Sequence, residues 1–558
     1  MAEIGILGNG VAANLAAAYF RKTFPDLGVA VIGRNPPRRP IVGESLVEVS
    51  TLFIRELGLG PLLIERHHPK YGLTYYYKQK LEDPSDRRYV VDEAPALPPF
   101  PSFEVNRFTF DRDLRACNAA AGVTQLEDRI VDVEIVKGAH RVLSEAVDGS
   151  KRETVCRWLV DATGRSRVLG RRLGLHIRPA LQKDVFWFWL VDFDPALLSR
   201  IDAVKKENRS FDSYYCTHHF FGRGSWIWCI PIVAEDRRPM ISIGITYRKD
   251  LHPREIRSLA DFLEQVGAEH PVVTDLVRSG SVRETNFYGS YMYEATRRYS
   301  PDGWFLLGDA ADTVDPLYSL GLALTSLQIR QIGAAIAEER RGAPTADFVA
   351  DLDIAFENAH HLATHEITDL YRVMHDPWRC HMRMHLAILA MFHLAVPLSM
   401  SGYMWDPAGV KIFNGLMRRE ALAAELGRLA ALVDAAAPAR PGYLKVQSVF
   451  SLNHRFFEHV RETDIPRSLA ALCLYLAALR LSLLRRLGPR GLVAFRHQGA
   501  ALRDLARAAA LRALFQGARL KESRIARRVL AEPPKARRAA ARRGVLDRPA
   551  FRPSPEAS

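Results

Sequence analysis

Apolar residues at the start of the chain fall into two short runs separated by an amphipathic stretch. The runs at 3–7 and 29–32 are typical of buried β-strands. Between them, residues 14–20 have the apolar spacing of a helix, and a glycine-rich turn at 8–13 precedes that helix. Strand, turn, helix and strand in this order predict a β-α-β unit.

Two further changes of pattern follow along the chain. The middle part is rich in aromatic and β-branched residues, which predicts a mostly antiparallel sheet. Its strands are predicted at 186–189, 211–221, 224–233 and 240–247. After about residue 325, alanine-rich amphipathic stretches predict helices. The two longest apolar runs, 386–398 and 469–479, are shorter than the ~18–20 residues that cross a bilayer, so we expect core helices and no transmembrane segment.

The composition is that of a globular protein with several domains. Of 558 residues, 48% are apolar and 25% are charged, which excludes collagen-like and wholly disordered chains. The 77 basic and 63 acidic residues leave a net charge of +14, and much of the excess lies near the C-terminus. Residues 532–558 are rich in arginine, alanine and proline, which predicts a disordered tail that is dispensable for chemistry. We expect this tail to attract an acidic partner such as a carrier protein, and we expect no nucleic-acid partner.

The cysteine pattern bears on the compartment and on metal binding. The six cysteines are scattered and form no C-x-x-C pair, which argues against a disulfide framework and against a zinc site. Glu3 stands where a secretory signal peptide would carry positive charge, so we expect a cytoplasmic protein. His361 and His365 lie one helical turn apart without a visible third ligand, so we expect a helix-surface pair and no metal.

The glycine-rich turn after the first strand is a candidate phosphate site. It reads G-N-G-V-A-A, and Gly8, Gly10 and Ala13 leave room for a phosphate at the helix N-terminus. In dinucleotide sites the second strand usually ends in an acid that binds the ribose, whereas here Gly33 occupies that position. The next residue, Arg34, either contacts a phosphate, stacks on adenine or is an ordinary surface arginine.

Two later segments indicate which dinucleotide binds. An apolar strand at 158–161 runs into D-A-T-G, and another leads into Gly308 and Asp309. An aspartate at such a strand end can hold a ribityl hydroxyl, and the helix that starts at Gly321 can face a flavin or an anion. With the first turn, these pieces resemble the glutathione-reductase-type FAD fold of flavoprotein monooxygenases. The resemblance implies an α/β fold that binds FAD, with an inserted, mostly antiparallel substrate-side sheet and a C-terminal helical region.

Four more motifs narrow the family. W-I-W-C-I-P at 226–231 matches a W-x-W-x-I-P motif, and G-E-S at 43–45 follows the second strand. An arginine–aspartate segment spans 103–111, and D-P-L-Y-S-L-G at 315–321 matches most of F-x-x-P-x-x-S-x-G. Over about residues 1–325 the chain therefore resembles the flavin-dependent halogenases, a tryptophan-halogenase-like family.

Two positions depart from the family pattern. Thr313 replaces the phenylalanine of the last motif, and Tyr318 stands where tryptophan-acting members carry a glutamate. The second change favours a phenolic or pyrrolic substrate over free tryptophan. Residues 371–397 also look like the helical region of halogenases that act on pyrroles and phenols.

The resemblance implies a defined chemistry. FADH2 and O2 form a flavin C4a-hydroperoxide, which oxidises chloride or bromide to hypohalous acid. That acid then halogenates an aromatic natural-product precursor, free or tethered to a carrier protein, as in the secondary metabolism that makes antibiotics. Because the one dinucleotide turn is used for FAD, we expect a separate flavin reductase as the electron donor.

The resemblance also assigns roles to individual residues. FAD contacts are expected at Gly8, Gly10, Ala13, Arg34, Glu44, Ser45, Arg107, Gly308, Asp309, Pro316, Gly321 and Leu322. The halide is expected at Ser319, Leu320 and Gly321, with Ser319 also counted as catalytic. Trp226 and Trp228 are expected to keep the substrate off the flavin. The lysine that holds or carries the oxidised halogen is either Lys70, in a K-x-G pattern, or the nearby Lys78.

The expected organisation follows from these assignments. An FAD-binding module takes residues 1–335, with its substrate-side sheet at about 60–110 and 180–300. Helical regions at 336–440 and 441–531 and the tail at 532–558 follow, and Pro438, Pro441 and Gly442 mark a boundary. Three alternative functions stay open: an aromatic hydroxylase, a desaturase-type FAD oxidoreductase and a halogenase-like protein without activity.

Overall fold

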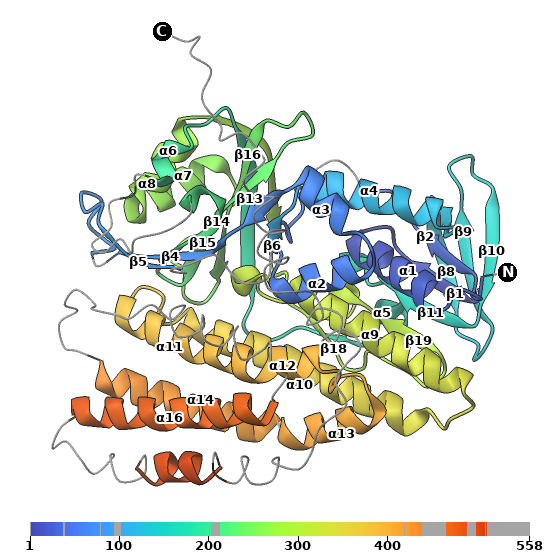
Figure 1. Cartoon of the computed structure of the whole chain (residues 1–558). Helices are drawn as coiled ribbons and strands as arrows, with labels where there is room; N and C mark the ends of the chain where they lie inside the picture. The colour runs from blue at the N-terminus through green and yellow to red at the C-terminus, as the bar shows by residue number, and fades with distance from the viewer. Residues whose placement is uncertain are drawn as a thin grey trace.

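The computed structural model (Figure 1) gives the arrangement of most of the chain. It describes residues 2–36, 40–78, 80–93, 102–199, 201, 212–417, 419–437, 465–487, 498–507 and 509. The predicted boundary at 438–442 and the predicted basic tail at 532–558 lie outside these residues, and both stay predictions.

A five-stranded parallel sheet carries the N-terminal part of the fold, in the order β19-β11-β1-β2-β7. Its strands are β1 (Ile4–Leu7), β2 (Val29–Ile32), β7 (Thr124–Leu126), β11 (Trp158–Asp161) and β19 (Trp304–Leu306). α1 (Val11–Thr23) connects β1 to β2, which confirms the predicted β-α-β unit. The carboxyl ends of the parallel strands meet at one edge of the sheet, which is where such sheets bind ligands.

Smaller elements surround this sheet. β8 (Arg129–Glu134), β9 (His140–Glu145) and β10 (Lys151–Cys156) form an antiparallel sheet between β7 and β11 in the chain. β3 (His68–Lys70) pairs with β6 (Ser102–Glu104), and β12 (His176–Ile177) pairs with β18 (Glu294–Ala295). The helices of this part are α2 (Glu48–Glu56), α3 (Gly60–Arg66), α4 (Arg107–Ala120), α5 (Val168–Arg172) and α9 (Gly321–Arg340). α4 and α9 both contact α1.

A seven-stranded sheet forms the second half of the fold, in the order β17-β13-β16-β15-β14-β4-β5. Its strands are β4 (Gly72–Lys78), β5 (Tyr89–Glu93), β13 (Lys183–Val191), β14 (Cys216–Gly222), β15 (Ser225–Val233), β16 (Pro239–Arg248) and β17 (Ser281–Tyr288). Neighbours are antiparallel except β4 and β14. The four predicted strands are confirmed as β13 to β16, but β14 begins later than predicted. Residues Ser213–Tyr215 form a 3-10 turn instead, because the Asp212 side chain accepts the Tyr214 N–H.

Both faces of the seven-stranded sheet are covered. Every residue of β13 and β15 is buried, which explains the apolar runs at 185–191 and 226–233. Trp226 faces a core that it shares with Tyr371 of the C-terminal helices. Ile227 points the other way, into a core that includes α7 (Leu259–Glu269) and α8 (Pro271–Arg278).

Helices follow α9 and lie on one side of both sheets in Figure 1. They are α10 (Ala346–Leu370), α11 (Pro377–Ala390), α12 (Val396–Met400), α13 (Pro407–Leu416), α14 (Arg419–Ala436) and α16 (Ile465–Leu487). A π-helical turn at Met391–Ala395 joins α11 to α12, just ahead of Pro397, which has no backbone N–H to continue the α-helical pattern. The predicted change to helices is confirmed, and none of the described helices is long and apolar enough to cross a membrane.

Candidate functional site

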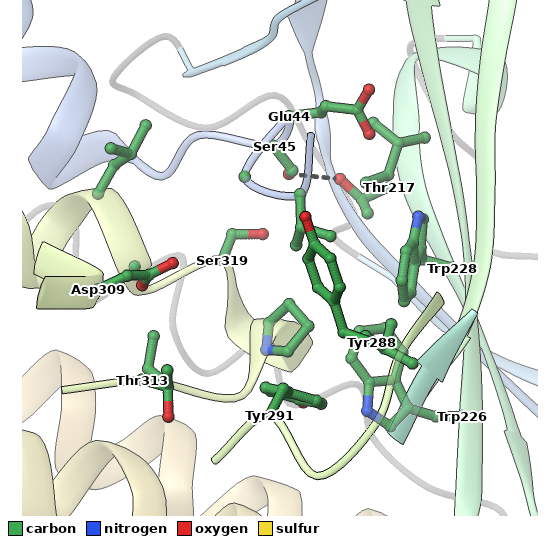
Figure 2. Close-up of a pocket in the computed structure, with 18 of the residues that line it drawn as sticks. Glu44, Ser45, Thr217, Trp226, Trp228, Tyr288, Tyr291, Asp309, Thr313 and Ser319 are labelled. Atoms are coloured by element: carbon green, nitrogen blue, oxygen red, sulfur yellow. Dashed lines mark hydrogen bonds between the residues drawn. The ribbon is translucent and has the colours of Figure 1, made fainter. Parts of the chain in front are cut away.

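A pocket lies between the carboxyl end of the parallel sheet and one face of the seven-stranded sheet (Figure 2). Loops after β2, β11 and β19 contribute Val42, Gly43, Glu44, Ser45, Arg165, Asp309, Thr313, Val314, Pro316, Ser319, Gly321 and Leu322. The seven-stranded sheet contributes Val185, Thr217, His219, Trp226, Trp228, Ile230 and Tyr288. Figure 2 shows Asp309 and Ser319 on one side and the two tryptophans on the other. Many of the residues predicted for FAD, for halide and for the substrate barrier thus line one pocket.

The turn after β1 has the shape of a phosphate site. Gly8 has a φ of +96°, and a Cβ there would meet the Ala162 carbonyl oxygen at 2.5 Å, so the position requires glycine. A Cβ on Gly10 would have no atom within 4 Å, which leaves open space at the N-terminus of α1. Ala13 is buried in the first turn of that helix. These residues fit the diphosphate of a dinucleotide.

The structure at the end of β2 explains why Gly33 replaces the acidic residue that usually binds the ribose in dinucleotide sites. A Cβ on Gly33 would lie 2.8 Å from Gly8 Cα, so there is no room for a carboxylate side chain. The polar groups at this strand end are amides instead: Asn9 Nδ2 donates to the Gly33 carbonyl oxygen at 3.2 Å and to Asn35 Oδ1 at 2.9 Å. Arg34 is exposed, and its contact with FAD stays a prediction.

The G-E-S segment is held by the first turn of α4. Arg107 and Asp111 form a buried bidentate ion pair, with Nε–Oδ1 at 2.9 Å and Nη2–Oδ2 at 3.1 Å. The Nη1 of Arg107 donates to the Val42 carbonyl oxygen at 3.0 Å. Gly43 has a φ of +101°, and a Cβ there would lie 2.7 Å from that Nη1. Arg107 therefore positions the loop that carries Glu44 into the pocket.

Two buried carboxyl groups line the pocket. Trp189 Nε1 donates to Glu44 Oε1 at 2.8 Å, and burial raises the pKa of Glu44 to about 7. Asp309 follows β19 as predicted, and burial raises its pKa while Arg107 and Arg165 oppose that shift. The position of Asp309 at the end of a parallel strand fits a ribityl hydroxyl.

A buried ion pair fixes the start of the loop at 315–321. Asp315 Oδ2 accepts hydrogen bonds from Lys183 Nζ at 2.7 Å and from the Tyr371 hydroxyl at 2.6 Å. Its Oδ1 accepts the Leu317 N–H at 3.0 Å. The Lys183 and Asp315 side chains are 1% and 0% exposed, so water does not screen their attraction. The pair connects this loop to the seven-stranded sheet.

The rest of that loop leads into α9. Ser319 has a left-handed backbone, with φ 57° and ψ 32°, and Leu320 precedes the first helical residue, Gly321. Ser319, Gly321 and Leu322 line the pocket, whereas Leu320 packs against the core on the tryptophan side. The N-terminal end of a helix carries partial positive charge, so this wall suits an anion.

Trp226 and Trp228 stand side by side on β15, with ring centroids 5.6 Å apart, and both line the pocket. Trp226 Nε1 donates to the Tyr371 hydroxyl at 2.8 Å, and Trp228 Nε1 donates to Ser242 Oγ at 3.3 Å. Gly244 pairs with Trp228 across the strands, and a Cβ there would lie 2.1 Å from the indole ring. The indole positions are thus fixed by hydrogen bonds and by a glycine that makes space.

The structure separates the two candidate lysines. Lys70 is buried, and its Nζ donates to Ser45 Oγ at 2.8 Å and to the Leu46 carbonyl oxygen at 2.9 Å. Because Ser45 lines the pocket, the Lys70 ammonium lies one hydrogen bond behind the pocket wall. Burial lowers the pKa of Lys70, and Glu104 and Glu48 oppose that shift.

Lys78 has a different environment at the far end of β4. Its Nζ donates to the carbonyl oxygens of Asp83 at 2.6 Å and Glu269 at 3.0 Å. Neither partner lines the pocket, and nor does Lys78. Of the two lysines, Lys70 is the one hydrogen-bonded to a residue that lines the pocket, and its catalytic role stays a prediction.

The sequence profile of the tryptophan halogenase family matches residues 74–366, which is more than half of the chain. The chain belongs to the tryptophan halogenase family. The matched region includes most of β4, the other strands of the seven-stranded sheet, the loop at 315–321 and most of α10.

Two proteins to which this chain is similar carry halogenase names. The flavin-dependent halogenase chlA of Dictyostelium discoideum is 28% identical over 360 residues, or 59% of this chain and 58% of that protein. The 1H-pyrrole-2-carbonyl-(peptidyl-carrier protein) chlorinase of Pseudomonas fluorescens is 25% identical over 358 residues, which cover 59% of this chain and 74% of the chlorinase. The match to chlA thus spans less than two thirds of that relative.

A solved structure shares the fold. The crystal structure of halogenase PltM in complex with phloroglucinol and FAD superposes with a TM-score of 0.60. The sequence identity is 17%, and the match covers 88% of this chain and 98% of that one. At this identity the likeness shows the fold alone, and it agrees with the α/β fold and C-terminal helical region predicted from the sequence.

Several residues of the site are not part of the family motifs recognised in the sequence. Thr217 and His219 line the pocket from β14, and burial lowers the pKa of His219 to about 3, so its ring is neutral. A signal is visible in retrospect, because three consecutive polar residues, Thr217 to His219, stand in a strand that is buried throughout. Lys183 gave no such signal, since its partner Asp315 is 132 residues away.

The histidine pair on α10 gives no sign of a metal centre. The rings of His361 and His365 lie 4.9 Å apart. Within the part of the chain that the structure describes, no three histidine, cysteine, aspartate or glutamate side chains come together in a way that could hold a metal ion.

Proposed function

We propose that the protein is a flavin-dependent halogenase that uses FADH2, O2 and chloride or bromide to halogenate an aromatic small molecule. The observation that carries this proposal is that Ser319 and Gly321 share one pocket with Trp226 and Trp228. A hydroxylase has no use for such a tryptophan pair, because its substrate must reach the flavin. The family match over residues 74–366 supports the same activity.

FAD is the cofactor that fits this chain. The residues proposed to hold it are Gly8, Gly10, Ala13 and Arg34 at the dinucleotide end and Glu44, Ser45, Arg107, Gly308, Asp309, Pro316, Gly321 and Leu322 at the flavin end. The open space at Gly10 supports a diphosphate at the N-terminus of α1. When bound and reduced, the flavin would reduce O2 to the oxidation level of a peroxide, which is the oxidant that the halide needs.

The halide is proposed to bind where the loop enters α9, at Ser319, Leu320 and Gly321. Ser319 and Gly321 line the pocket, and Gly321 begins α9, whose N-terminal end carries partial positive charge that favours an anion. The buried Lys183–Asp315 pair supports this role, because it holds the loop in one conformation before any ion arrives.

Lys70 is proposed to hold or carry the oxidised halogen. Its ammonium reaches the pocket wall through Ser45, which is hydrogen-bonded to Thr217 of the seven-stranded sheet at 2.9 Å. The lowered pKa of Lys70 raises the fraction of neutral amine, the form that can accept a halogen. Trp226 and Trp228 are proposed to hold the substrate beyond the flavin.

The substrate is proposed to be a phenol or a pyrrole. Aromatic side chains supply much of the wall, including Trp226, Trp228, Tyr288 and Tyr291. Tyr318 in place of the glutamate of tryptophan-acting members supports this choice. The Pseudomonas fluorescens relative acts on a pyrrole carried by a peptidyl-carrier protein, which supports a carrier-tethered substrate as well as a free one.

The last parts of the proposal concern the electron donor and the cellular compartment of the protein. A separate flavin reductase would provide FADH2, because the one glycine-rich dinucleotide turn is assigned to FAD. The six cysteines are free thiols, which suits a reducing compartment, and we propose the cytoplasm. Aromatic natural-product synthesis, including that of antibiotics, is the proposed context.

We expect the purified protein, given FAD and an aromatic substrate, to oxidise NADPH slowly or not at all. Adding a flavin reductase should start product formation. The measurement is NADPH absorbance with and without the reductase, followed by mass spectrometry of the products. Rapid NADPH oxidation by the protein alone, stimulated by the substrate and yielding a hydroxylated product, would show a hydroxylase instead.

A further inference from the structure

A chain of three hydrogen bonds runs behind the pocket wall. Lys70 Nζ donates to Ser45 Oγ at 2.8 Å, and Ser45 Oγ lies 2.9 Å from Thr217 Oγ1. The Thr217 hydroxyl donates to Glu104 Oε1. When Glu104 is a carboxylate, Thr217 gives its only proton to Glu104 and accepts the proton of Ser45, so every donor in the chain points from Lys70 toward Glu104.

The four side chains of this hydrogen-bond chain are held by the fold and are shielded from bulk water. The four side chains are buried, with Glu104 at 0% and Lys70 at 3% exposure. Glu104 lies in β6, which pairs with β3, the strand of Lys70. Ser45 forms a backbone bridge with Glu104. Ser45 and Thr217, the two central hydroxyls, line the pocket, so a group bound there sits next to the middle of the chain.

The charges around the chain bring its two ends toward a common proton affinity. Burial raises the pKa of Glu104 to about 8, and Lys70 limits the rise. Burial lowers the pKa of Lys70, and Glu104 limits the fall. The other titratable groups near the two ends are Glu44, Glu48, Tyr214, Cys216 and His219. The pKa shifts at both ends therefore favour the neutral forms, an amine at Lys70 and a carboxylic acid at Glu104.

We propose that Glu104 is the positioning residue that takes a proton from Lys70 through the hydroxyls of Ser45 and Thr217. The transfer breaks an N–H bond of Lys70, gives that proton to Ser45, passes the Ser45 proton to Thr217 and the Thr217 proton to Glu104. An ammonium and a carboxylate become an amine and a carboxylic acid, and no electrons are exchanged. The use of this amine rests on the proposed function.

In that function the neutral amine meets hypohalous acid, the product of halide oxidation. The nitrogen lone pair attacks the halogen, the N–halogen bond forms and the O–halogen bond breaks. One remaining N–H proton goes to the departing hydroxide and gives water. Glu104 thus sets the pH at which the Lys70 nitrogen has a free lone pair. A direct ion pair between Lys70 and Glu104 would instead hold Lys70 as an ammonium.

Infrared spectroscopy of the full-length protein without added flavin tests the proton chain directly. The C=O band of a protonated carboxylic acid should disappear as the pH rises through about 8, and Glu104→Gln should remove that band. Lys70→Met and Thr217→Val should move its midpoint to higher pH, by about one unit or more, because each removes a group that favours the carboxylate. Thr217→Ser should restore the midpoint, and circular dichroism checks folding.

A second arm measures single-turnover halogenation across pH. Glu104→Gln and Thr217→Val should slow it by about 10²-fold and flatten its pH dependence, and Thr217→Ser should rescue it. The control is Asp128→Asn, which removes another buried carboxyl that accepts a hydrogen bond from Ser144 at 2.8 Å, away from the pocket. It should change neither readout.

The outcomes distinguish this proposal from the proposed function. If Thr217→Val leaves the infrared midpoint and the pH–rate profile unchanged, the proton chain is refuted. If Glu104→Gln retains the wild-type rate and profile, Glu104 has no role in the reaction. If the wild-type protein halogenates nothing but the midpoint still moves in Thr217→Val, the proton chain stands and the proposed function fails.

Discussion

Replacing Lys70 with methionine is expected to reduce halogenated product by about 10²–10³-fold, because the group that holds or carries the oxidised halogen is lost. Methionine keeps the length and apolar stem of the side chain, so the buried site stays filled. FAD binding should be unchanged, since Lys70 does not line the pocket. The measurement is product per FADH2 supplied, with the FAD dissociation constant determined in parallel.

Lys78→Met is the matched control, because it removes a second buried lysine from the same part of the chain. Its Nζ is bonded to the carbonyl oxygens of Asp83 and Glu269, so the change should cost stability but leave turnover within about twofold. Normal turnover in the Lys70 variant, or a loss confined to the Lys78 variant, would contradict the assignment.

Lys183→Met is expected to be the most destabilising single change discussed here. It leaves Asp315 buried without its cation, and breaking one side of a buried ion pair costs about 3–5 kcal/mol in unfolding free energy. The loop at 315–321 should also lose its fixed position, so FAD binding should weaken. Denaturant titration of the variant and of the wild type measures the first effect, and FAD titration measures the second.

The double variant Lys183→Met/Asp315→Asn shows whether the charge is the cause. With both charges removed, much of the lost stability should return, because no buried carboxylate is left unpaired. Arg254→Met serves as the exposed control: Arg254 pairs with Glu264 at the surface, at 65% and 69% exposure, and such pairs contribute less than about 1 kcal/mol. Equal losses in the Lys183 and Arg254 variants would be inconsistent with a structural role for the buried pair.

Local sequence patterns were sufficient to predict most strands of the parallel sheet. The apolar run at 29–32 is β2, and the run at 158–161 is β11, because buried parallel strands are continuously apolar. The predicted strand at 211–221 is longer than the observed one, since the side chain of Asp212 stabilises a turn before the strand begins. Turn chemistry of this kind competes with strand propensity and is easily missed.

The site depends on contacts that local patterns do not contain. The sequence favours Lys70 over Lys78 only modestly, through the glycine that follows at position 72. The pairing of β3 with β6 brings Lys70 next to the wall that Ser45 forms. Glu104 lies in a strand of three residues and reaches Thr217 across 113 positions in the chain. Such pairs form when strands that are distant in sequence pack together, so no local sequence motif predicts them.

The most direct test of the central claim is a product analysis with bromide. The protein is incubated with FAD, a flavin reductase, NADPH, O2 and bromide, and phloroglucinol, simple pyrroles and a pyrrole on a peptidyl-carrier protein are offered as substrates. The account predicts a product with the paired isotope pattern of bromine that is absent without bromide and lost in Lys70→Met. A hydroxylated product that carries 18O from labelled O2 and forms without any halide would contradict it.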